Sequence, residues 1–162
     1  MSPIKSYTLT FIFFLFSLLS FGQQNEFQTS GDEYYSNQDY ENAFTSFKKC
    51  YETDSLNVKC LQSAGLSAYR LGDIPEARKL FLELIKTDST NRIGLTQLAT
   101  IFEQSKNTPK AIKYYNQLTK IFPDNAVFYR KLAQQYQGAG LMTEAFTNYL
   151  KANALNKRDL FT

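Results

Sequence analysis

The sequence repeats itself every 34 residues, and this period constrains its fold more than any other feature. An alanine recurs in four successive copies with no insertion or deletion between them, and an aromatic residue follows each alanine by four positions. The alanines are Ala43, Ala77, Ala111 and Ala145, and the aromatic residues are Phe47, Phe81, Tyr115 and Tyr149. Because residues four apart lie on the same face of a helix, each pair predicts one amphipathic helix.

Another helix is predicted ahead of each of these helices, so that every copy contains a first helix and a second helix. In the third copy, four apolar residues fall at the spacing i, i+3, i+4, i+7 that places them on one helical face: Leu95, Leu98, Ala99 and Phe102. Gly72 and Gly140 indicate the turn between the paired helices in two copies. Asp73 and Thr108 each place a capping oxygen just ahead of a proline, which predicts where two of the second helices begin.

This pattern resembles the tetratricopeptide repeat family over residues 24–159. The resemblance implies an all-α fold, a right-handed superhelical solenoid of four helix-turn-helix repeats with a concave groove lined by the first helix of each repeat. The implied repeats are 24–57, 58–91, 92–125 and 126–159, and they form one tetratricopeptide repeat domain over residues 23–162. The implied helices lie near 24–37, 40–53, 58–71, 74–87, 92–105, 108–121, 126–139 and 143–155.

Residues 1–22 have the order of segments of a secretory signal peptide. Lys5 is followed by an apolar run over residues 9–19, and the small residues Ser20 and Gly22 come next. That run is shorter than the roughly 20 residues that a membrane-spanning helix needs. We expect cleavage after Gly22 and export to the periplasm or the outside of the cell, with no stable membrane span afterwards. The alternative is an uncleaved anchor.

Composition excludes several kinds of chemistry. The chain has no His, so it lacks the imidazole base of nucleophilic triads, and its two Cys cannot build a closed zinc site. Its formal net charge of +3 is ordinary for 162 residues and does not indicate nucleic-acid binding. We therefore expect no enzymatic activity, no catalytic residues, no metal and no cofactor.

The family resemblance places a set of polar first-helix residues in the concave groove. These are Gln28, Asp32, Tyr35, Lys59, Gln62, Tyr69, Arg70, Thr96, Thr100, Glu103, Arg130 and Gln134. Such side chains can form hydrogen bonds with the backbone of an extended peptide. We expect four of these residues to contribute most to the binding affinity: Tyr35, Tyr69, Arg70 and Arg130. The predicted function is a non-catalytic scaffold that binds a peptide or protein partner in the cell envelope. The alternatives are a carbohydrate-binding or peptidoglycan-associated module and a structural spacer with a solvated polar face.

Cys50 and Cys60 are placed almost symmetrically about the turn near Ser55. An exported chain allows them to form a disulfide across two antiparallel helices. The competing interpretation is two reduced, buried thiols that act as small apolar residues.

The aromatic residues at the repeated positions are expected to lie in the core. They are Tyr34, Phe47, Phe81, Phe102, Tyr115, Tyr136 and Tyr149. After the fourth repeat only residues 160–162 follow, so we expect Phe146, Leu150 and Ala154 to leave apolar surface for self-association through the C-terminal repeat. The alternative is that these three residues turn inward and only Asn148, Lys151 and Asn153 face solvent.

Overall fold

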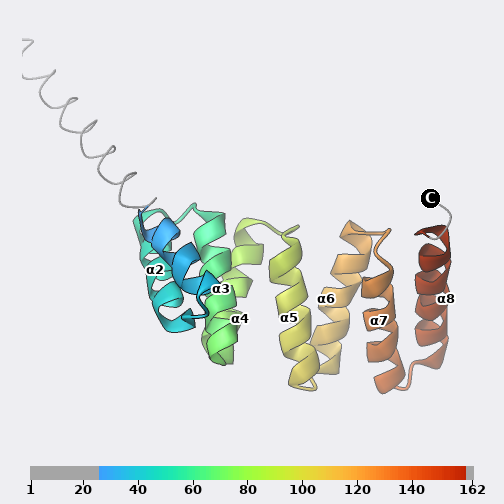
Figure 1. Ribbon diagram of the computed structural model, residues 1–162. Coiled ribbons are helices and arrows are strands. Elements are labelled where there is room, and N and C mark those ends of the chain that lie inside the picture. Colours follow the sequence, from blue (N-terminus) through green and yellow to red (C-terminus); the bar gives the residue numbers. More distant parts are fainter. Residues whose placement is uncertain (1–25, 160–162) are drawn as a thin grey trace, which may run out of the picture. The chain divides into compact units, whose positions relative to one another are not determined.

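The computed structural model describes residues 26–159. The predicted signal peptide, its cleavage after Gly22 and residues 160–162 lie outside the described residues. The described elements are helical residues 26–36, followed by α2 (Tyr40–Thr53), α3 (Val58–Leu71), α4 (Ile74–Thr87), α5 (Arg92–Gln104), α6 (Thr108–Ile121), α7 (Ala126–Gly138) and α8 (Met142–Asp159) (Figure 1). Residues 26–159 contain no strand, and the expected all-α fold class is confirmed. No helix in this range is long and apolar enough to cross a membrane.

Helix starts are set by polar caps that also recur every 34 residues. Asn57, Asn91 and Asn125 cap α3, α5 and α7, whereas Asp39 and Asn107 cap α2 and α6. In each case a side-chain oxygen accepts a hydrogen bond from a backbone N–H of the first turn, which would otherwise have no partner.

The predicted start of α6 at residue 108 is correct, but the predicted cap is wrong by one residue. Thr108 is the first residue of the helix, and the cap is Asn107, whose Oδ1 accepts from the Lys110 N–H at 3.3 Å. At the start of α4 the predicted cap is correct, because Asp73 Oδ1 accepts from the Glu76 N–H at 3.1 Å.

The turn within each helix pair contains one residue in the left-handed backbone conformation. Gly72 and Gly140 occupy this position in two turns, with φ of 81° and 77°. Gln38 and Lys106 occupy it in the other two, with φ of 63° and 56°. These four residues are 34 apart, so all four turns share one backbone geometry although only two of them carry glycine.

The chain forms two compact units, one ending at Leu80 and the other beginning at Phe81 within α4. In the first unit α2 packs against α3, and Gly31 lies so close to Phe47 that a Cβ at this glycine would come within 2.7 Å of the ring. In the second unit α5 packs against α6, α6 against α7, and α7 against α8.

The repeated small residues lie in the cores of the two units. Ala43, Ala77, Ala111 and Ala145 are all buried. Most of the repeated aromatic rings are buried or half-buried with them. The prediction that Tyr34 lies in the core is wrong, because 39% of this residue is exposed to solvent. Phe146, Leu150 and Ala154 are also exposed, whereas Asn148 is half-buried, so these apolar side chains do not turn inward.

Candidate functional site

In the first unit, three contacts join helical residues 26–36 to α3. Lys59 Nζ lies 3.4 Å from Asp32 Oδ2, Gln28 Oε1 lies 3.7 Å from Cys60 Sγ, and the Arg70 guanidinium donates a hydrogen bond to the Tyr35 hydroxyl. Five of the predicted groove residues are therefore brought together on two neighbouring first helices: Gln28, Asp32, Tyr35, Lys59 and Arg70. We call these five residues the first-unit surface.

The hydrogen bond from Arg70 to Tyr35 raises the pKa of Arg70, and Tyr40 and Tyr69 add smaller favourable electrostatic effects. The Tyr35 and Tyr40 rings meet edge to face, with centroids 5.3 Å apart. No carboxylate of residues 26–159 forms an ion pair with Arg70, which is exposed at the end of α3. The guanidinium therefore keeps donors available beside an aromatic wall.

In the second unit, Glu103 on α5 connects three helices. One of its carboxylate oxygens accepts a hydrogen bond from the Tyr115 hydroxyl on α6 at 2.6 Å, and the other lies 3.0 Å from Lys131 Nζ on α7. Burial raises the pKa of Tyr115, and its hydrogen bond to Glu103 raises that pKa further. Glu103 is thus paired with Lys131, and no ion pair among residues 26–159 joins it to Arg130.

A pocket of about 240 Å³ opens between α5 and α7 of the second unit. Its lining residues are Arg92, Ile93, Thr96, Gln97 and Phe128. Arg92 is exposed and has no ion-pair partner among residues 26–159, and Phe128 makes part of the lining aromatic. The pocket is therefore suited to an apolar side chain that has a carboxylate nearby.

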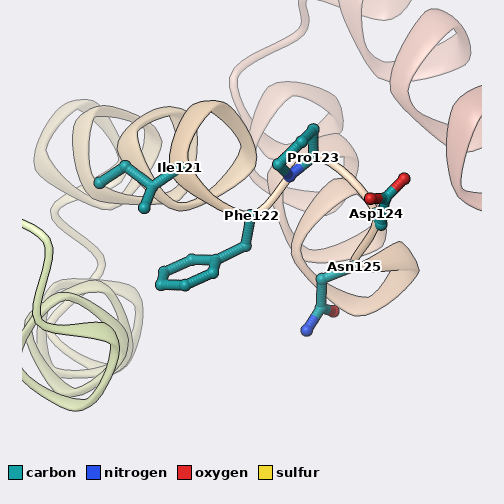
Figure 2. Close-up of a pocket in the computed structure, with 5 residues that line it drawn as sticks. All are labelled: Ile121, Phe122, Pro123, Asp124 and Asn125. Atoms are coloured by element: carbon teal, nitrogen blue, oxygen red, sulfur yellow. The ribbon is translucent and has the colours of Figure 1, made fainter.

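A second hollow, of about 370 Å³, is lined by the last residue of α6, Ile121, and by residues 122–125 of the turn that follows it. Figure 2 shows the side chains of Phe122 and Asn125 on one side of the turn. Pro123 and Asp124 point away from that side. Because its polar groups do not converge, this hollow is a weaker candidate than the pocket between α5 and α7.

The sequence profile of the tetratricopeptide repeat family matches residues 27–55 and residues 94–125. These two stretches fall within the first and third of the four repeats defined by the 34-residue period. The chain belongs to the tetratricopeptide repeat family. Repeats of this family build protein-interaction scaffolds, and a scaffold is the class of function that they support here. No curated protein sequence matches the chain.

Solved tetratricopeptide repeat structures have the same fold. A crystal structure of MamA superposes with a TM-score of 0.80 at 19% identity, covering 86% of this chain and 81% of MamA. A tetratricopeptide repeat protein from Parabacteroides merdae ATCC 43184 also gives 0.80 at 19% identity, covering 84% of this chain and 54% of that protein. A fragment of MamA from Desulfovibrio magneticus RS-1, from residue 41 to the end, gives 0.76 at 16% identity, covering 83% of this chain and 76% of that fragment.

The remaining predicted groove residues lie on the first helices of the tetratricopeptide repeats without forming a cluster of their own. Gln62 and Tyr69 are half-buried on α3, and Arg130 and Gln134 are exposed on α7. Thr96 lines the pocket between α5 and α7, and the hydroxyl of Thr100, one turn later, donates to the Thr96 carbonyl at 2.9 Å.

Sequence reasoning missed several residues of these surfaces. Tyr40 lies in a second helix, so the family pattern did not place it near Tyr35. Lys131 is 28 residues from Glu103, a separation with no local signal. Arg92, Gln97 and Phe128 occupy first-helix positions where the repeat pattern has no fixed residue type, and only the packing of α5 near α7 brings them together.

The two cysteines are joined. Cys50 on α2 and Cys60 on α3 form a disulfide with their Cα atoms 6.0 Å apart. Both residues are fully buried, and the Asn57 amide donates to Cys50 Sγ at 3.7 Å. The bond fixes α3, which carries Lys59 and Arg70, against α2.

Proposed function

We propose that this tetratricopeptide repeat protein is exported and binds an extended peptide segment of a protein partner in the cell envelope, on the exposed surface of its first helices. The observation that carries the proposal is the position of Arg70 and Arg92, which both face solvent on first helices and have no carboxylate partner among residues 26–159. Each lies beside aromatic surface, Tyr35 for Arg70 and Phe128 for Arg92.

The chemistry of these arginines defines the ligand. An exposed guanidinium presents a planar set of donors that matches a carboxylate, and aromatic rings beside it add contact area at a low cost in ordering. The pocket between α5 and α7 accepts an apolar side chain next to Arg92. We therefore expect peptides in which an acidic residue neighbours an aliphatic or aromatic one.

Selection from a peptide display library, followed by fluorescence anisotropy on the selected peptides, tests this function. Arg70→Gln and Arg92→Gln should each weaken binding by more than about 1 kcal/mol. Arg78→Gln is the matched control, because Arg78 is exposed on α4, a second helix, and should leave affinity unchanged. Equal affinity for all four proteins would contradict the proposal.

A second candidate is an envelope carbohydrate- or peptidoglycan-associated module. The edge-to-face Tyr35 and Tyr40 rings beside Arg70 favour it, since such rings also pack on sugars and the guanidinium pairs with sugar acids. Cosedimentation with purified peptidoglycan that depends on Arg70, together with failure to select any peptide, would favour this candidate over the first.

A further inference from the structure

The outer face of α8 exposes a row of large apolar side chains. Met142, Phe146 and Leu150 follow one another at four-residue intervals and are 61%, 65% and 54% exposed. At this spacing they form a continuous stripe along one side of the helix. We call these three residues the α8 stripe.

The repeat period identifies what packs on such a stripe. The residues 34 positions before Phe146 and Leu150 are Ile112 and Asn116 on α6, and both are half-buried. Asn116 Nδ2 donates to the Tyr136 hydroxyl on α7 at 3.0 Å, so these α6 positions face the first helix of the next repeat. The α8 stripe therefore has the position of a contact surface for another first helix.

The matching first-helix surface is also open to solvent. Tyr34 lies three periods before Tyr136 and is 39% exposed. Phe27 and Ser30 share its face at the spacing i, i+3, i+7 and are only half-buried. In the fourth repeat the equivalents of these two residues are Tyr129 and Leu132, which are 5% and 2% exposed.

The charge of the first helix disfavours pairing two first helices with each other. Residues 26–36 contain three acids and no base, a formal charge of −3: Glu26, Asp32 and Glu33. Among the α8 residues whose side chains the structure describes, Lys151 balances Glu144. Two first helices would bring like charges together, whereas a contact between a first helix and α8 does not.

We propose that the chain associates head to tail, with the α8 stripe of one copy packed on the first helix of a second copy around Tyr34. The contact repeats between copies the packing that α6 and α7 make within one copy. Because each copy keeps one free stripe and one free first helix, such a contact generates assemblies that lengthen with concentration.

Light scattering across a concentration series tests the proposal on protein purified after expression with its own N-terminal segment. The wild-type mass should rise with concentration. Leu150→Glu and Tyr34→Glu should each shift the onset of association at least about tenfold higher in concentration. Leu56→Glu is the matched control, because Leu56 is 80% exposed in the turn after α2 and should associate like the wild type.

Mixing the two blocked variants gives the decisive result. The Leu150→Glu protein keeps its first helix and the Tyr34→Glu protein keeps its α8 stripe, so the mixture should form a one-to-one pair and nothing larger. A wild type that stays monomeric throughout would overturn the proposal, and so would Tyr34→Glu protein that associates normally by itself, since that result requires α8-to-α8 pairing. Circular dichroism checks the fold, and Phe146→Gln and Tyr34→Gln replace any variant that loses helix content.

Discussion

At the scale of single residues, the four left-handed turn positions differ in how well the sequence fits the backbone. Lys106 has a φ of 56°, a region that costs most side chains roughly 1–2 kcal/mol. Lys106→Gly should therefore raise the free energy of unfolding by about 0.5–1 kcal/mol after the extra entropy of the unfolded glycine is subtracted. Urea denaturation measures this change, and Gly72→Ala should lower the midpoint instead. A lower midpoint for Lys106→Gly would contradict the assignment of strain.

Gly31 illustrates a residue whose side chain is excluded by packing. A Cβ at this position would lie 2.7 Å from two ring atoms of Phe47, which is buried. Gly31→Ala should destabilise the protein by about 1–3 kcal/mol, because the ring has little room to move. Gly138→Ala is the control, since a Cβ at that glycine would meet no neighbouring side chain within 4 Å, and it should be neutral or stabilising. Thermal unfolding monitored by circular dichroism compares the two.

The turns also show what sequence reasoning finds at this scale. Gly72 and Gly140 revealed two of the four turns because glycine tolerates positive φ. Gln38 and Lys106 adopt the same geometry without any signal of residue type, and only their 34-residue spacing from the glycines marks them. Thr108 was mistaken for a cap because both Thr and Asn are good caps, and the sequence does not decide between adjacent candidates.

At the scale of helices, the contacts of Glu103 with Tyr115 and Lys131 tie α5, α6 and α7 together. The pKa of Tyr115 is raised in the folded protein by burial and by its hydrogen bond to Glu103. A tyrosine with a raised pKa stabilises the fold below the unfolded value of about 10, and this contribution is lost as the pH rises through the folded pKa. Stability should therefore fall above about pH 10.

Tyr115→Phe should reduce this loss, because phenylalanine does not ionise in the unfolded chain. Urea midpoints at about pH 8 and pH 11 compare the two proteins. The variant keeps part of the alkaline loss, since burial also raises the pKa of Tyr114. An alkaline decrease of the same size in both proteins would show that Tyr115 does not contribute.

Helix positions were predictable and the partnerships between helices were not. The bounds of α2, α3, α4 and α6 agree with the predicted ranges, because repeated apolar residues and local caps determine where each helix begins and ends. The pairing of Glu103 with Lys131 depends on side chains from different repeats, and that of Tyr35 with Arg70 does too. Sequence identified first-helix residues as candidates, but packing decided which of them meet.

At the scale of the whole molecule, the N-terminal pattern and the cysteines point to the same compartment. Residues 1–22 have the features of a signal peptide, and a disulfide such as that between Cys50 and Cys60 is typical of proteins in oxidising compartments. Removal of this segment takes away Lys5, so 17 bases remain against 15 acids and the formal charge falls from +3 to +2. The proposed export would account for both features.

The native protein should consequently begin near Gln23 and contain no free thiol. Mass spectrometry of the protein recovered from outside the cytoplasm measures both properties, since cleavage removes residues 1–22 and the disulfide lowers the mass by two hydrogens. The control is a chain that starts at residue 23 and is expressed in the cytoplasm, where we expect two free thiols and an unfolding free energy lower by about 2–3 kcal/mol. A native N-terminus at Met1 or Ser2 on a soluble cytoplasmic protein would contradict export. Two free thiols in protein recovered outside the cytoplasm would contradict the disulfide alone.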